Sequence, residues 1–79
     1  MNDNLKGKRL LLLGGASQHR KVVKTAQDMG VYVICTDPYT DSPAKKIADK
    51  SYAFDVRDID TLIELCRTEH IDGVLNLCL

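Results

Sequence analysis

The sequence has no long apolar run and no excess of either charge. Runs such as Leu10 to Leu13 are far shorter than the roughly 20 residues that a membrane-spanning helix needs. Eleven basic residues balance eleven acidic ones, which argues against nucleic acid or a membrane surface as the main partner. No apolar signal segment follows the polar start Met1 to Asn4, so we expect a cytoplasmic protein.

The sequence also lacks the patterns of a metal site or a catalytic centre. Cys35, Cys66 and Cys78 are odd in number and widely spaced, with no C-x-x-C and no Cys/His cluster at zinc spacing. We therefore expect three small, buried, free thiols. No Ser/His/Asp or Cys/His arrangement stands out, and no pair of carboxylates has a spacing that singles out acid–base chemistry. The sequence thus predicts neither a metal site nor a catalytic residue in this chain.

The apolar pattern alternates between strands and helices. Gly14 and Gly15 end a first strand, Gly30 suits the position just after the helix that follows, and Asp58 suits an N-cap. The last helix is expected to bury Ile59, Leu62, Ile63 and Cys66. The pattern predicts strands over 10–13, 31–36, 51–54 and 73–77, with helices from 17 to 29, from 43 to about 48, and after 58.

This alternation predicts an α/β fold. Seventy-nine residues suffice for one small domain, which buries only about 60% of its unfolded surface. We expect residues 1–8 to form a polar lead-in and residues 9–79 a Rossmann-like open parallel sheet. The predicted strand order is 3-2-1-4, with helices on both faces and an incomplete C-terminal edge. Ligands of such sheets bind at the carboxyl ends of the strands, beside the first and fourth strands here.

The turn after the first strand is the first candidate site. Glycines let a backbone approach a ligand, and free N–H groups at a helix start bind anions. A plain strand-to-helix turn needs glycine as well. His19, Arg20 and Lys21 favour the anion, because cations at a helix start oppose its dipole. The dinucleotide fingerprint G-x-G-x-x-G is broken by Ala16 and His19, and the G-x-x-x-x-G-K-[ST] nucleotide loop is missing.

Three acidic positions and one histidine have simpler interpretations. Asp37, at the end of the second strand, suits either a ribose hydroxyl contact or an Asx turn before Pro38. Asp55 and Asp58 suit the capping of the last helix. His70 lies in a connection, where a surface or helix-end histidine is expected.

From about Lys8 onward the chain resembles the N-terminal pre-ATP-grasp domain of ATP-grasp enzymes. That superfamily includes the large chain of carbamoyl-phosphate synthetase, biotin carboxylase and the purine-pathway carboxylate–amine ligases. The matching segments are LLLLGGASQHRK, DMGVYVICTD and EHIDGVL, together with the more specific run D-P-x-x-x-S-P-A-x-x-x-A-D from Asp37 to Asp49. The turn after the first strand departs from the Gly-Glu/Gln-Leu-Gly of the purine-pathway branch, so the resemblance points to carbamoyl-phosphate-synthetase-like members.

The resemblance implies a role in substrate binding. The parent protein would join a carboxylate to an amine through an acyl phosphate, with ATP and Mg²⁺ held in later ATP-grasp domains and no cofactor in this chain. This domain would form part of the pocket for a small-molecule carboxylate or amine. The residues implied are Gly14, Gly15, Ala16, Ser17, Gln18, His19, Arg20 and Asp37.

Two other functions remain open at this point: an NAD(P)-binding Rossmann domain, and a non-catalytic binding or regulatory module. In the pre-ATP-grasp domain the apolar fourth strand would be an exposed edge. We therefore expect a homo-oligomer that forms through this edge or through the face that the missing domains would cover.

Overall fold

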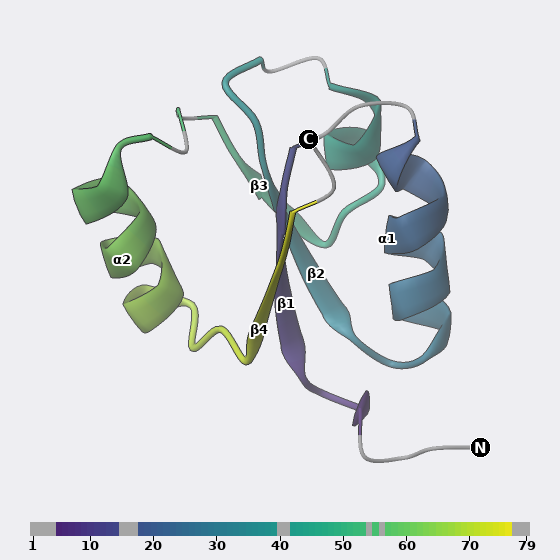
Figure 1. The fold of residues 1–79 in the computed structure, drawn as a ribbon. Helices are drawn as coiled ribbons and strands as arrows, with labels where there is room; N and C mark the ends of the chain where they lie inside the picture. The colour runs from purple at the N-terminus through teal and green to yellow at the C-terminus, as the bar shows by residue number, and fades with distance from the viewer. Residues whose placement is uncertain (1–4, 15–17, 40–41, 54, 56, 77–79) are drawn as a thin grey trace.

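The computed structural model describes residues 5–14, 18–39, 42–53, 55 and 57–76. A four-stranded parallel sheet has the order β3-β2-β1-β4. Helices α1 and η2 lie on one side of the sheet and α2 on the other (Figure 1). The α/β class, the strand order and the helices on both faces are thus confirmed. The elements are β1 (Arg9–Leu13), α1 (His19–Asp28), β2 (Tyr32–Thr36), η2 (Pro43–Lys46), β3 (Lys50–Tyr52), α2 (Ile59–Thr68) and β4 (Gly73–Asn76).

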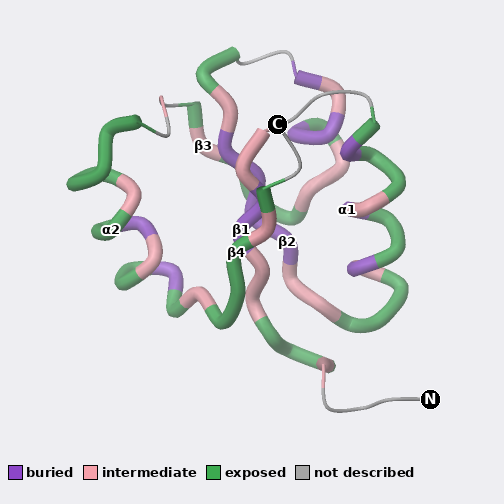
Figure 2. Tube along the Cα trace, in the orientation of Figure 1, coloured by how far each residue is buried: buried purple, intermediate pink, exposed green. Residues whose placement is uncertain are grey.

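The core has two layers because the central strand β1 is covered on both faces. Leu11 and Leu12 are both fully buried but point to opposite sides of the sheet. Leu12 packs under α1 with Val23, Ala26, Val33, Cys35 and Ala44, whereas Leu11 packs under α2 with Ile34 and Leu65. Figure 2 shows the buried residues concentrated where the strands cross the middle of the molecule. The leucine run of β1 therefore supplies both layers at once.

The third strand begins and ends earlier than the sequence pattern predicted. The predicted span was 51–54, whereas β3 runs from Lys50 to Tyr52 and residue 54 lies outside the described part. Asp49 accounts for the early start: its N–H donates to the Val33 carbonyl at 2.9 Å, and its carboxylate accepts the Val33 N–H at 2.8 Å. These two bonds begin the hydrogen-bonded pairing of β3 with β2 just before Lys50.

The packed face of α2 also differs from the prediction. Ile59 and Ile63 are 57% and 50% exposed, whereas Leu65 is buried. Leu62, Leu65 and Cys66 face the sheet instead. The packed stripe runs through Leu62, Leu65 and Cys66 at spacings of three and four residues, so Ile59 and Ile63 lie beside it. Cys35 is buried and free as expected, Cys66 is free but half-buried, and Cys78 lies outside the described residues.

Within the described residues, no helix combines the length and the apolar character needed to cross a membrane.

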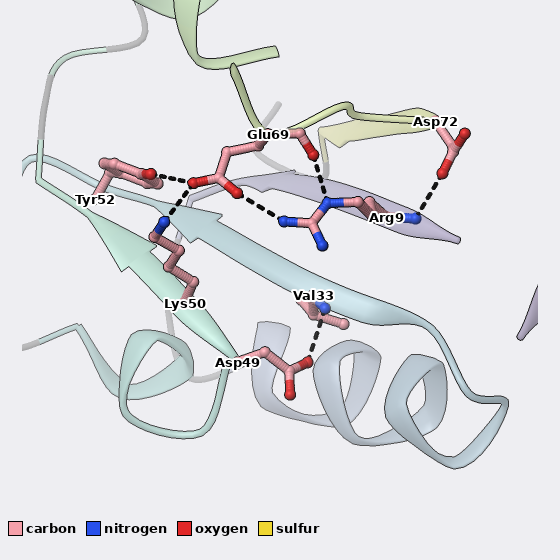
Figure 3. A network of polar contacts seen from close by, with 7 residues as sticks. All are labelled: Arg9, Val33, Asp49, Lys50, Tyr52, Glu69 and Asp72. Carbon is pink, nitrogen blue, oxygen red and sulfur yellow. Dashed lines mark hydrogen bonds and ion pairs between the residues drawn. The ribbon is translucent and has the colours of Figure 1, made fainter. Parts of the chain in front are cut away.

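A buried carboxylate ties α2 to the sheet (Figure 3). The Glu69 side chain, at the end of α2, is only 6% exposed. Its Oε1 receives a bond from Arg9 Nη2 at 2.7 Å, and its Oε2 receives one from Lys50 Nζ at 2.6 Å and one from the Tyr52 hydroxyl. Arg9 Nε donates to the Glu69 carbonyl. One carboxylate therefore joins β1, β3 and α2.

These donors favour the charged form of Glu69. The bonds from Lys50, then from Tyr52 and Arg9, outweigh desolvation and lower the pKa of Glu69 to about 2. The folded-state pKa thus lies below the ordinary value of 4.5. The network therefore stabilises the fold above about pH 4.5, and this contribution is lost as the pH falls toward 2.

Both long helices end in the same left-handed turn. After α1, the Gly30 and Val31 N–H groups donate to the Gln27 and Ala26 carbonyls. After α2, the N–H groups of His70 and Ile71 donate to the carbonyls of Arg67 and Cys66. Each pair of bonds is a Schellman motif, which needs positive φ at the C′ residue, the first residue after the helix C-cap. Gly30 has φ +84° and His70 has φ +54°, so only the second motif holds a side chain in the strained region. The helix-end position expected for His70 is confirmed.

We predict that Glu69→Gln removes part of the acid sensitivity of the fold. The variant should lose roughly 2 kcal/mol of unfolding free energy at pH 7, since a buried charge network is left incomplete. Its stability should then fall less steeply than that of the wild type between pH 5 and pH 2. Urea unfolding at several pH values measures both effects. Glu64→Gln, at a largely exposed glutamate of the same helix, is the control, and parallel curves for Glu69→Gln and the wild type would contradict the prediction.

Substitution of the positive-φ residue at the end of each helix should change the unfolding free energy in opposite directions. Gly30→Ala should cost roughly 1–2 kcal/mol, and its Cβ would lie 3.2 Å from the Lys6 Cα. His70→Gly should instead stabilise the protein by up to about 1 kcal/mol, because the strain of a side chain at positive φ is relieved. Denaturant unfolding at neutral pH compares them, and a stabilised Gly30→Ala protein would contradict the assignment.

Candidate functional site

The candidate site lies where the parallel strands end together. Leu13 of β1 pairs with Thr36 of β2 and with Asn76 of β4, and Thr36 pairs with Tyr52 of β3. All four carboxyl ends therefore meet at one edge of the sheet. This carboxyl edge, defined by Leu13, Thr36, Tyr52 and Asn76, is where open α/β sheets bind ligands.

Gly14 makes the turn that begins at this edge. Its φ is +108°, which a residue with a side chain rarely adopts. Its N–H donates to the Thr36 carbonyl at 2.7 Å, so the pairing with β2 continues one residue past the strand. The predicted glycine turn is confirmed at Gly14, whereas Gly15, Ala16 and Ser17 lie outside the described residues.

The start of α1 has no side-chain cap. Gln18 precedes the helix, makes no capping bond with its side chain and is exposed, and the first turn contains no acidic residue. Arg20 and Lys21 are exposed beside it. The positive end of the helix dipole and these two exposed cations thus favour an anionic or strongly polar group.

His19 does not lie where the sequence suggested. We expected it to present a cation in the first turn, but the residue is completely buried. Its position explains the difference, because Val23 and Ala26 follow at i+4 and i+7 and both face the sheet. His19 therefore belongs to the buried stripe of α1, and of the expected basic cluster only Arg20 and Lys21 are exposed.

Asp37 makes the expected turn directly after β2. Its Oδ1 accepts the Tyr39 N–H at 2.9 Å, and its own N–H donates to the Tyr52 carbonyl at 3.2 Å. The Asx turn is thus confirmed. The residue is half-buried at the carboxyl edge, where open α/β sheets bind ligands.

Lys45 is a site residue that the sequence analysis missed. It lies in η2, is only 8% exposed, and its Nζ donates to the carbonyls of Asp37 at 3.0 Å and Tyr39 at 2.9 Å. A lysine beside Lys46 is typical of a solvated surface. One feature of the sequence did point to Lys45: it directly follows Ala44 of the D-P-x-x-x-S-P-A run, at a position that the short helix η2 places in the interior.

Cys35 forms the floor between these turns. Its Sγ donates to the Gly14 carbonyl at 3.1 Å. Burial and the Asp37 charge raise the pKa of the thiol to about 11, against an opposing effect of Lys45. Cys35 therefore stays protonated at neutral pH and is not a nucleophile. Asp37 and Lys45 both affect the pKa of this one thiol, so both charges lie close to Cys35.

The arrangement provides polar recognition rather than acid–base chemistry. It brings together Gly14, the start of α1, Asp37 and Lys45 around the carboxyl edge. In the described part of the chain, no three His, Cys, Asp or Glu side chains are grouped so that they could hold a metal ion. A cavity of about 500 Å³ lies at the opposite end of β1, beside Arg9 and Asp72, and is separate from this edge.

Comparison with known proteins assigns the family. The model of the PylC-like N-terminal domain matches residues 10–78, nearly the whole chain. The chain belongs to this family. Its resemblance to the N-terminal domain of ATP-grasp ligases is thereby confirmed, and the pre-ATP-grasp fold agrees with the observed sheet.

Similar proteins include two formate-dependent phosphoribosylglycinamide formyltransferases. The chain is 38% identical to the Methanocaldococcus jannaschii protein over 72 residues, which cover 90% of the chain and 18% of that protein. It is 36% identical to the Sulfurovum protein over 67 residues, which cover 85% of the chain and 17% of that protein. The PylC-like chain thus spans less than a fifth of these relatives.

Solved structures show the same fold. Glycinamide-RNase-transformylase T from Mycobacterium tuberculosis superposes with a TM-score of 0.83 at 31% identity, over 90% of this chain and 20% of that one. N5-carboxyaminoimidazole ribonucleotide synthetase from Thermotoga maritima gives 0.69 at 28% identity, over 90% and 19%. These names refer to phosphoribosylglycinamide, glycinamide or carboxyaminoimidazole ribonucleotide, and none of them refers to carbamoyl phosphate.

Proposed function

We propose that this chain is the substrate-binding N-terminal domain of an ATP-dependent carboxylate–amine ligase. The observation that carries the proposal is the carboxyl edge: a glycine turn, a helix start with exposed cations and a half-buried aspartate meet on a fold shared with such ligases. This edge would form one wall of the pocket for a small-molecule carboxylate or amine. The chain itself is not proposed to catalyse the reaction.

Each site residue would have a separate role. Gly14 would let the backbone approach the substrate, and Gly15, Ala16 and Ser17, which lie outside the described residues, are proposed as site residues from the sequence alone. Gln18, Arg20 and the start of α1 would bind its anionic or polar end, while Asp37 would accept a bond from an amine or a hydroxyl. His19 would support the turn from within the core.

ATP and Mg²⁺ would be bound by ATP-grasp domains of a longer protein. A similar solved structure, 27% identical, is described as an ADP complex of purK, which supports ATP use in the intact ligase. The finer assignment to a carbamoyl-phosphate-synthetase-like ligase rests on the sequence from Gly15 to Arg20, which departs from the turn of the purine-pathway branch.

Ligand titration tests this function against its alternatives. Nuclear magnetic resonance of the ¹⁵N-labelled chain would follow separate additions of phosphoribosylglycinamide, bicarbonate, Mg²⁺–ATP and NADH. We expect phosphoribosylglycinamide or bicarbonate, the two acceptor substrates tested, to shift the amide resonances of Gly14, Gln18 and Asp37. Mg²⁺–ATP should shift none of these resonances. Saturable NADH binding at this edge would support the dinucleotide-binding alternative instead. The absence of any shift with both acceptors would contradict the proposed function.

A charge variant sharpens this experiment. Asp37→Asn should weaken acceptor binding at least about tenfold, a loss of roughly 1.4 kcal/mol. The Asx turn should survive, because asparagine also accepts the Tyr39 N–H. Asp28→Asn, at an exposed residue at the far end of α1, is the control and should not change binding.

We also propose that the chain self-associates through β4. This strand forms one edge of the sheet and carries no charged residue, whereas the opposite edge, β3, carries Lys50. Val74 is 54% exposed and lies in register with Leu11, on the face covered by α2. The exposed Ile59 and Ile63 belong to that helix. An uncharged edge with apolar neighbours favours pairing with the β4 of a second copy.

Substitution of the edge strand tests the pairing. The wild-type chain should elute as a dimer or larger species in size-exclusion chromatography with light scattering. Val74→Lys should shift it toward the monomer, because a charge at an edge opposes strand pairing. Ser51→Lys, at an exposed residue of β3, serves as the control and should leave the mass unchanged. A monomeric wild type at high concentration would contradict this proposal.

A further inference from the structure

The buried lysine of η2 points to a positioning role. Lys45 is 8% exposed, and a buried ammonium is costly unless hydrogen bonds compensate for the lost water. Within the described residues, its Nζ bonds only to the carbonyls of Asp37 and Tyr39. It forms no ion pair with a carboxylate there. The charged ammonium therefore donates its hydrogen bonds to two backbone carbonyls of one turn.

The turn after β2 is organised around this ammonium. The Tyr39 carbonyl also accepts a bond from Ser42 Oγ at 3.2 Å, and the Tyr39 N–H donates to Asp37 Oδ1 at 2.9 Å. The Lys45 N–H donates to the Ser42 carbonyl at 3.1 Å, so the start of η2 is joined to the same turn. Asp37 is thus held twice: its carbonyl by Lys45, and its carboxylate by Tyr39.

The same lysine lies close to the rest of the site. Its charge and that of Asp37 act in opposite directions on the Cys35 thiol, which is bonded to the Gly14 carbonyl. Because Lys45 is buried and its Nζ bonds to the carbonyls of Asp37 and Tyr39, the ammonium lies against the turn after β2 rather than on the outer surface of η2. Lys46, the next residue, is exposed. Of the two adjacent lysines, Lys45 is therefore the one that belongs to the site.

We propose that Lys45 is a positioning residue for substrate binding: its ammonium fixes the turn from Asp37 to Tyr39 and so directs the Asp37 carboxylate toward the ligand. The inference rests on the proposed function, in which Asp37 contacts the acceptor substrate. Lys45 acts through Asp37 and does not touch the substrate itself.

A double-mutant cycle tests this coupling. Lys45→Met should weaken binding of the acceptor probe, phosphoribosylglycinamide or bicarbonate, at least about tenfold. The double variant Lys45→Met/Asp37→Asn should bind no more weakly than Asp37→Asn alone, because the two residues act as a unit. Lys45→Arg, which retains the charge and its donors, should recover part of the affinity. Lys46→Met is the matched control and should bind like the wild type. Additive losses in the double variant would overturn the inference.

A ligand-free measurement separates this inference from the proposed function. In Lys45→Met, amide hydrogen exchange at Tyr39 should accelerate at least about tenfold, while exchange at Leu12 in the core stays unchanged. If the variant does not fold, exchange of the side-chain ammonium protons in the wild type provides the test, with Lys45 expected to exchange more slowly than Lys46. Equal exchange would overturn the inference. A wild type that binds no probe but meets these expectations would contradict the proposed function and not the positioning of the turn.

Discussion

Burial of β1 on both faces is the constraint on which the rest of this molecule depends. The strand pairs in parallel with β2 on one side and β4 on the other. Parallel neighbours require crossover connections, and these place α1 and α2 over opposite faces. Leu11 and Leu12 then fill the two layers that the helices enclose. A chain with one small core thus obtains two packed layers from a single strand.

Polar contacts at the beginning of the strands complete this framework. Asp72 exchanges two backbone-directed bonds with Arg9 where β1 meets β4, and Asp49 does the same with Val33 where β2 meets β3. Glu69 joins β1 and β3 to the end of α2. Asp49 and Asp72 are exposed, whereas the Glu69 carboxylate is buried, where an unpaired charge would be costly. The bonds of Asp49 and Asp72 help to hold the strands in register at the ends opposite the carboxyl edge, where the N–H groups of Gly14 and Asp37 add further bonds between the strands.

The carboxyl edge brings together the residues of the proposed site. Gly14 and Asp37 directly follow the adjacent strands β1 and β2, and Lys45 bonds to the turn that begins at Asp37. The family match and the shared fold fit a sheet whose carboxyl edge is the proposed binding site. The buried, protonated Cys35 completes the floor without adding a nucleophile.

The sequence by itself determined the order of the elements, the parallel sheet and the turn residues at Gly14, Gly30, Asp37 and Asp58. Those features depend on local periodicity, on backbone freedom and on short-range hydrogen bonds, which neighbouring residues specify. Tertiary structure alone decided that His19 and Lys45 are buried, that Ile59 and Ile63 are exposed, and that Glu69 joins three elements. Each of these outcomes depends on where one element meets another, and residues far apart in the sequence set that geometry.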